Sequence, residues 1–139
     1  MPTMQVEVVS PEKVLFSGEA IQVITRTIGG GEIAFLPGHA PFLGALTENH
    51  TRIGLADGTT LDVAVHGGFV QVSGTTVSIL SDVAELSEQI DRARALRAKE
   101  HAEARLRSEH DAEAIAALSR AHARLNATGG TPGSTTSVH

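Results

Sequence analysis

The large apolar side chains of this chain lie almost entirely in its first 86 residues. Thirty-one Val, Ile, Leu, Met or Phe residues occur at or before Leu86, and only seven occur after it. A chain of 139 residues can bury one substantial core but not two, so residues 1–86 must form the core domain. We expect residues 87–126 to be a small appendage, and residues 127–139, rich in Gly, Ser and Thr, to be a disordered tail.

Alternating apolar and polar residues with many β-branched side chains predict short strands in the core domain. Asp57-Gly58 lies between two such patterns and is typical of a hairpin turn. Seven strands at this spacing favour an antiparallel β-sandwich or flattened barrel. The expected strands are Gln5–Val9, Ala20–Thr27, Glu32–Leu36, Thr51–Leu55, Thr60–Val65, Phe69–Val72 and Thr76–Leu80.

The appendage is predicted to be an antiparallel hairpin of two helices, which makes the whole chain α+β. Twelve Ala and no Gly or Pro occur between Ser87 and Thr128, and this composition strongly favours helix. Ser87 is expected to cap the first helix, and Ser108 with Asp111 to cap the second.

Each predicted helix has two seams of mostly small apolar residues. One seam of each helix could join the helices to each other while the second rests on the core domain, or the seams could serve alternative partners. Six large apolar side chains cannot hold some forty ordered residues strongly, so the hairpin is expected to be detachable. In the first helix, one seam consists of Leu86, Ile90, Ala93 and Ala104 and the other of Ala95, Ala98, Ala102 and Leu106. In the second helix, one seam consists of Ile115, Leu118, Ala121 and Leu125 and the other of Ala112, Ala116 and Ala123.

Composition excludes several classes of function. The net charge of −5 and the scarcity of aromatic residues argue against nucleic acid binding. The absence of Cys, of metal-ligand spacing among the seven His and of a membrane-length apolar run predicts a soluble intracellular protein without a metal site. No catalytic motif is present, so we expect a protein that binds protein partners and is not an enzyme.

Two segments are more than scaffold. Leu36–Phe42 contains two Pro and one Gly, which predict a rigid loop that displays His39; the alternative is a turn in which the imidazole satisfies nearby backbone groups. Ile90–Ala95 opens the first helix, and its charged residues could form ordinary surface ion pairs with Glu85, Arg120 and Arg124 or could line a pocket for a polyanion such as a nucleotide.

Four stretches of the sequence, in this order and spacing, resemble the epsilon subunit family of bacterial F-type ATP synthases, the counterpart of the mitochondrial delta subunit. The loop Leu36–Pro41 is the most specific of these features, and the match spans residues 5–126. The stretches are Val8–Glu12 leading to Leu15–Ala20, Gly31–Ile33 leading to Leu36–Pro41, Gly67–Val72, and Val77–Ala84.

The resemblance implies a rotor subunit of the central stalk that couples the c-ring and the gamma subunit to the catalytic head. Glu32, Pro37, Gly38 and His39 would then lie on the c-ring and gamma side. The hairpin of such a protein can extend and block ATP hydrolysis, which would bring basic residues against the alpha and beta catalytic subunits. Those residues are Arg105, Arg107, Arg120 and Arg124.

The resemblance also implies a regulatory ATP site, although no cofactor is required. Ile90, Asp91, Arg94 and Ala95 match the family's I/L-D-x-x-R-A motif, with accessory groups expected at Glu85, Arg120 and Arg124. His101 stands where a further Arg is expected, so ATP affinity is predicted to be weak or absent. The location implied is the cytoplasmic face of the bacterial plasma membrane, reached only through the complex.

A different class of function remains as the alternative hypothesis. It is a stand-alone β-sandwich that binds a ligand and uses the helical arm to oligomerise. Such a protein would need convergent titratable groups in a pocket, and the core domain offers only scattered acids with His39, His50 and His66.

Overall fold

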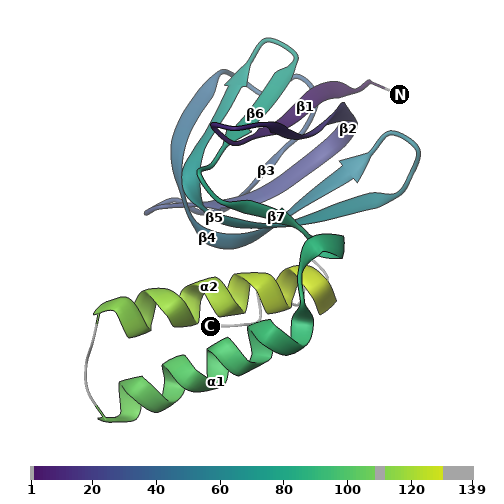
Figure 1. The fold of residues 1–139 in the computed structure, drawn as a ribbon. Helices are drawn as coiled ribbons and strands as arrows, with labels where there is room; N and C mark the ends of the chain where they lie inside the picture. Colours follow the sequence, from purple (N-terminus) through teal and green to yellow (C-terminus); the bar gives the residue numbers. More distant parts are fainter. Residues whose placement is uncertain (1, 109–111, 130–139) are drawn as a thin grey trace.

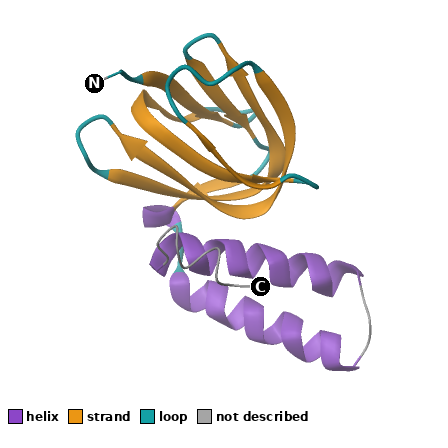
Figure 2. Ribbon diagram, turned by 180° about the vertical axis from the view of Figure 1, so that it is seen from behind, coloured by secondary structure: helices purple, strands orange, loops and turns teal. Residues whose placement is uncertain are grey.

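The computed structural model describes residues 2–108 and 112–129. Strands form a closed, flattened domain, and a pair of antiparallel helices lies against one side of it (Figures 1 and 2). This arrangement confirms the predicted α+β class, a β-sandwich or flattened barrel followed by a helical hairpin.

The strand domain contains seven strands and ends in a short 3₁₀ turn before the helices begin. The strands are β1 (Met4–Val9), β2 (Val14–Thr27), β3 (Gly31–Phe35), β4 (Phe42–Leu55), β5 (Thr60–Ser73), β6 (Thr76–Leu80) and β7 (Ala84–Leu86). The remaining elements are η1 (Ser87–Gln89), α1 (Arg92–Ser108) and α2 (Ala112–Gly129).

The strands follow the order β1-β6-β5-β4-β2-β3, and β1 also pairs with β2, which closes the sheet. All pairings are antiparallel except β1 with β6, which is parallel. β7 pairs with β5 through three residues, Val63 with Leu86, Ala64 with Glu85 and Val65 with Ala84. The fully buried core includes Val6, Val8, Val23, Phe35, Ile53, Val63, Val65, Val70 and Ile79.

Three strands, β2, β4 and β5, are longer than expected. β2 begins at Val14 and not at Ala20. β4 begins at Phe42 and not at Thr51, and its centre contains buried polar residues where the apolar alternation fails. There the Asn49 side-chain oxygen accepts hydrogen bonds from the Thr51 and Thr25 hydroxyls, at 2.7 and 3.2 Å. A satisfied polar network can be buried at small cost, but its residues resemble a loop in the sequence.

The two strands expected at Thr60–Val65 and Phe69–Val72 are one bent strand, β5. Gly67 and Gly68 lie at the bend with φ of 82° and 120°, which side-chain-bearing residues rarely adopt. A Cβ atom at Gly68 would also overlap the carbonyl oxygen of Leu80. The glycine pair therefore bends β5 and lets β6 approach it, without ending the strand.

The first helix begins later than predicted. The expected cap at Ser87 is wrong, because Ser87 lies in η1 directly after β7 pairs with β5. Asp91 is the N-cap: its carboxylate accepts the backbone N–H of Arg94 at 3.0 Å, and its carbonyl accepts that of Ala95 at 3.0 Å.

The end of α1 and both ends of α2 adjoin residues that lie outside the described ranges. The predicted cap by Ser108 and Asp111 cannot be placed, since residues 109–111 lie outside the described ranges. α2 continues to Gly129, three residues past the expected end at Asn126. Residues 130–139 of the predicted tail lie outside the described part of the chain.

The two helices differ in what they contact. α1 packs mainly on α2, whereas α2 also packs on β4 and β5. Ala95 and Ala102 of α1 are buried, while Ala93 on its other seam is exposed and Ile115 of α2 is 53 % exposed. The interpretation in which each second seam rests on the core domain therefore holds for α2 and not for α1.

Candidate functional site

The hairpin meets the strand domain through a small apolar contact. Ala123 and Ala127 of α2 pack on Ala64 of β5, with Ile90 beside them. Removing a methyl group from water stabilises by about 0.8 kcal/mol, so three alanines and one partly buried isoleucine supply only a few kcal/mol. The contact is thin compared with the core of the strand domain.

A cavity of about 470 Å³ makes this interface still less complete. It lies between α2 and the sheet and is lined by polar residues from both, including Glu32, Glu48, His50 and His122. The Nδ1 atom of His50 is buried and has no hydrogen-bond partner within residues 2–108 and 112–129. Direct contacts of α2 with β4 and β5 therefore leave a polar cavity between the hairpin and the sheet.

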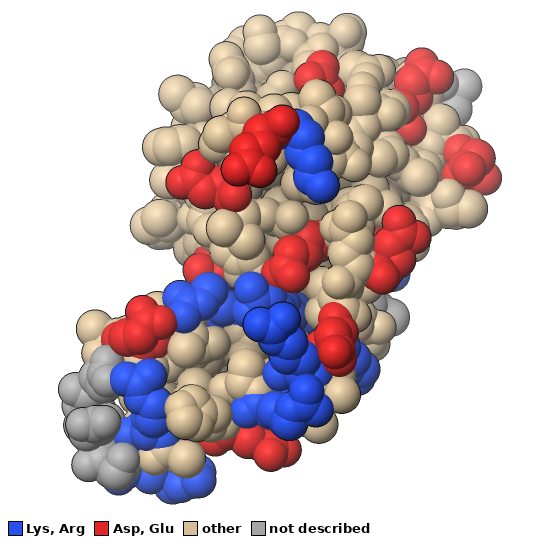
Figure 3. Space-filling view, in the orientation of Figure 1, with Lys and Arg blue, Asp and Glu red and all other residues tan. Residues whose placement is uncertain are grey.

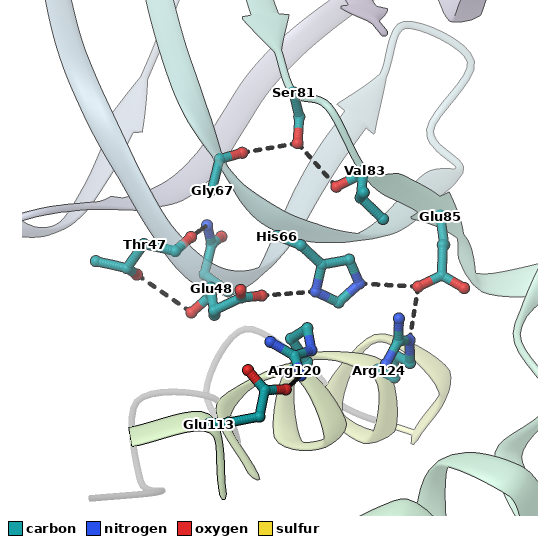
Figure 4. Close-up of polar contacts among 11 residues, drawn as sticks. Thr47, Glu48, His66, Gly67, Ser81, Val83, Glu85, Glu113, Arg120 and Arg124 are labelled. Carbon is teal, nitrogen blue, oxygen red and sulfur yellow. Dashed lines mark hydrogen bonds and ion pairs between the residues drawn. The ribbon is translucent and has the colours of Figure 1, made fainter. Parts of the chain in front are cut away.

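A polar cluster at the end of β7 supplies the specific attachment (Figure 4). The Nε of Arg124 on α2 donates to Oε1 of Glu85 at 2.7 Å, and Nε2 of His66 on β5 lies 2.8 Å from the same oxygen. Nδ1 of His66 lies 2.6 Å from Oε2 of Glu48 on β4. Arg124 and Glu85 thus form an ion pair between the two parts of the chain, which His66 and Glu48 extend into the sheet.

His66 contacts a carboxylate with each of its ring nitrogens. A neutral imidazole has one N–H and can donate to only one carboxylate, whereas the imidazolium donates to both. The observed geometry therefore suits the charged ring, which is nearly buried with 3 % of its side chain exposed. Residue spacing could not have predicted this cluster, because Glu48, His66 and Glu85 lie on three different strands.

The pKa of the Glu85 carboxyl lies below its ordinary value. Burial alone would raise this pKa, but the hydrogen bonds from Arg124 and His66, together with the positive charges of both groups, lower it further than burial raises it. Glu85 is therefore ionised at neutral pH and stabilises the docked hairpin there.

Four of the predicted nucleotide-site residues line one cavity of about 280 Å³. Glu85, Asp91, Arg94 and Arg124 contribute to it, together with Ile90 and Ala95 of the predicted motif. The volume is at the lower end of the range for ligand pockets. The guanidinium of Arg94 has no ion-pair partner in the described part of the chain, whereas Asp91 is already the cap of α1.

Arg120 is the predicted member that this cavity does not include. Its Nη2 forms an ion pair with Oε1 of Glu113 on the same helix, at 2.6 Å. His101 is exposed on α1 and does not line the cavity either. The cavity therefore brings together two arginines and two carboxylates, which could orient a small ligand with anionic and amine groups.

The predicted partner-binding residues do not form one cluster. Nδ1 of His39 lies 2.7 Å from the backbone oxygen of Ala40, and its ring packs edge-on against Phe35 with 4.8 Å between centroids. The contact with the Ala40 oxygen agrees with the alternative interpretation of the loop, a turn in which the imidazole satisfies a nearby backbone group. Pro37 and Gly38 lie in the same loop, with φ of 89° at Gly38. Glu32 lies at the other end of β3, in the cavity beneath α2.

Charge is divided between the two parts of the chain. On the face shown in Figure 3, most Lys and Arg side chains lie over the helices, and the strand domain carries mainly Asp and Glu. Arg105 and Arg107 belong to the last turn of α1, far from Glu85 and the 280 Å³ cavity. The hairpin thus has a basic surface beyond its contact with the sheet.

A row of apolar residues crosses the outside of the strand domain. Neighbouring strands place these residues opposite one another: Val14, Val9, Leu80, Phe69 and Ala45. Val14, Leu80 and Phe69 are 57, 42 and 53 % exposed. An apolar cavity of about 310 Å³ adjoins the row beside Val9, Phe69 and Leu80. Grouped exposed apolar side chains of this kind mark protein interaction surfaces, and sequence alternation alone did not reveal them.

None of the helices in the described ranges is long and apolar enough to cross a membrane. Comparison with protein families gives two matches that together cover the described chain. The beta-sandwich domain of the ATP synthase Delta/Epsilon chain matches residues 3–87, and its long alpha-helix domain matches residues 88–129.

Relatives match along nearly their full length. The ATP synthase epsilon chain of Streptomyces griseus is 41 % identical over 124 residues, which covers 89 % of this chain and 94 % of the relative. That of Shouchella clausii is 41 % identical over 128 residues, covering 91 % and 95 %.

Solved structures share the fold at lower identity. A chain of the Euglena gracilis mitochondrial ATP synthase aligns with a TM-score of 0.79 at 22 % identity, covering 91 % of this chain and 81 % of that one. A chain from the central stalk and c-ring structure of the Tetrahymena thermophila mitochondrial ATP synthase aligns with a TM-score of 0.57 at 20 % identity, covering 91 % and 96 %.

The ion pair between Glu85 and Arg124 predicts a pH-dependent attachment of the hairpin. Because docking lowers the pKa of Glu85, its stabilisation is present at neutral pH and is lost as the pH falls from about 4.5, the ordinary value, through the lowered one. Arg124→Gln should remove about 1 kcal/mol of docking stability at pH 7 and flatten this acid dependence. Hydrogen exchange of the α2 amides measures both the loss of docking stability and the flattened acid dependence.

Arg120→Gln is the matched control, because it breaks only the ion pair with Glu113 within α2. Equal effects of Arg124→Gln and Arg120→Gln would contradict a docking role for the Glu85–Arg124 ion pair.

Proposed function

The chain belongs to the delta/epsilon family of ATP synthase subunits, and on that premise we propose that it is a non-catalytic rotor subunit of an F-type ATP synthase. In this role it couples the c-ring and the gamma subunit to the catalytic head. Both parts of the chain match the family, so the helical arm belongs to this function and not to a stand-alone ligand-binding domain.

The apolar row on the strand domain is the observation that supports this role best. β1 and β6, which contribute Val9 and Leu80, lie on the side of the domain away from the helices (Figure 1). A surface that would otherwise expose Phe69 and Leu80 to water is stabilised when a protein partner covers it. We assign this surface to the gamma subunit, and the loop with Pro37, Gly38 and His39 to the neighbouring c-ring side. Glu32 lies near the beginning of β3, at the opposite end of the strand from this loop, and would contact the c-ring side only there.

The closed sheet suits a part that transmits torque. Each strand from β1 to β6 is hydrogen-bonded to its neighbours in the sheet, and the added pairing of β1 with β2 closes the sheet between these two strands. Force applied at one face therefore passes to the other through bonded strands. Attachment to the cytoplasmic face of a bacterial membrane follows from assembly with the c-ring.

The hairpin is proposed to act as a brake on ATP hydrolysis. Its thin apolar contact and, within residues 2–108 and 112–129, its single ion pair with the sheet would allow it to detach at modest cost, a two-state behaviour that ligands or partners can bias. On extension, Arg124 would leave Glu85, and it would join Arg105, Arg107 and Arg120 against acidic surfaces of the alpha and beta subunits.

The 280 Å³ cavity is proposed as a regulatory ATP site. Arg94 and Arg124 could bind phosphate oxygens, and Glu85 could accept a hydrogen bond from an amine or hydroxyl group. The site draws on both α1 and α2 as well as β7, so an occupied site would favour the docked hairpin.

Replacing Phe69 with Glu tests the assembly surface. The added charge would be buried without a partner at the interface, so F69E should lower binding to the gamma and c-ring subcomplex by at least tenfold. Co-purification of the tagged variant with that subcomplex measures the loss. Leu96→Glu, at an exposed apolar position on α1, should assemble normally; normal assembly of F69E would overturn the assignment.

Deleting the chain after Gln89 tests the brake. The shortened chain retains the strand domain and should assemble, while ATP hydrolysis by membranes that contain it should rise severalfold over wild type. Replacing Arg105 and Arg107 with Ala should give part of this rise. Hydrolysis that stays at the latent level in the truncated form would rule out an inhibitory hairpin.

Calorimetry with millimolar ATP tests the regulatory site. The wild-type chain should release heat on binding, and Arg94→Ala should weaken binding at least tenfold because it removes an unpaired cation from the cavity. Arg97→Ala, outside the cavity on the same helix, should leave binding unchanged. No heat from the wild-type chain would reject the site.

A further inference from the structure

The end of α2 lies beside the beginning of α1 (Figures 1 and 2). α2 has no basic residue in its own last turn, although its C-terminal carbonyl groups carry partial negative charge and lack partners within the helix. α1 has no acidic residue in its first turn and begins instead with Arg92. The positive charge that α2 lacks is therefore placed on the neighbouring helix.

Arg92 contacts the last turn of α2 directly. Its Nη1 donates to the carbonyl oxygen of Leu125 at 3.1 Å and to Oγ1 of Thr128 at 2.7 Å. The Thr128 hydroxyl in turn donates to the same Leu125 carbonyl at 3.0 Å. One guanidinium group thus binds both a backbone and a side-chain acceptor at the end of α2.

The position of Arg92 is unfavourable for its own helix. A positive charge at the first residue of α1 opposes the partial positive charge of that helix end, and the Asp91 cap offsets this only in part. The same charge is favourable at the C-terminus of α2. An arginine at residue 92 is therefore explained by the second helix and not by the first.

Gly129 leaves room for this contact. It does not have the positive φ that commonly requires glycine at a helix end. A Cβ atom there would lie 3.0 Å from Nη1 of Arg92 and 3.5 Å from its Cζ. A side chain at 129 would therefore require the guanidinium to shift by a few tenths of an ångström.

The turns that Arg92 holds are the ones that dock on the sheet. Ala123 and Ala127 form the apolar contact with Ala64, and Arg124, next to Leu125, forms the ion pair with Glu85. We propose that Arg92 is a cross-helix cap that closes the open end of the hairpin and positions the last two turns of α2 for docking. This inference does not depend on the function proposed above.

Hydrogen exchange of the full-length chain tests the cap. Arg92→Gln should raise the opening equilibrium of the amides of residues 125–129 about two- to fivefold, the range expected for a charge at a helix end. Thr128→Val should have a smaller effect, and the effects of the two changes should be less than additive in the double variant, because Arg92 and Thr128 contact each other. Arg92→Lys keeps the charge and should restore part of the protection.

Arg97→Gln is the matched control, since Arg97 is exposed on α1 and has no hydrogen-bond or ion-pair partner in the described ranges. Equal exchange in Arg92→Gln and Arg97→Gln, or strictly additive effects of Arg92→Gln and Thr128→Val, would overturn the proposal.

Discussion

The pairing of β7 with β5 determines where the hairpin sits. This pairing of three residues places Glu85 opposite Ala64. The Glu85 carboxylate therefore lies next to His66 and faces Arg124 of α2. The same residue pair places the apolar contact, because Ala64 is where Ala123 and Ala127 pack. A strand too short to stand out in the sequence therefore organises both the polar and the apolar attachment of the helices.

The two parts of the chain are held by very different amounts of interaction. The strand domain has a continuous apolar core and a closed set of strand pairings, so a local change is opposed by many contacts. In the described part of the chain, the hairpin rests on a few alanines, one ion pair to the sheet and a polar interface that contains a cavity. A rigid body with a weakly attached arm suits the proposed role, in which the arm would change state while the body would not.

Residues in the candidate sites act in more than one role, which limits what each can do. Asp91 caps α1 while it lines the 280 Å³ cavity, and Arg124 holds the hairpin to Glu85. Arg124 cannot keep this ion pair and also contact a distant catalytic subunit. In the proposed brake, docking and extension would therefore compete for the same guanidinium, and the junction at Glu85 would link regulation to attachment.

Composition and periodicity alone determined the division at Leu86, most strands and the helical arm, because apolar patterning and helix propensity are local properties of the chain; the family resemblance came from four specific stretches of sequence. The starts of β4 and α1, the glycine bend of β5 and the burial of only one seam of α1 were decided by tertiary contacts. The same holds for the cluster of Glu48, His66, Glu85 and Arg124 and for the cap by Arg92. These features join residues far apart in the chain, and no local pattern records which strand or helix end will meet which.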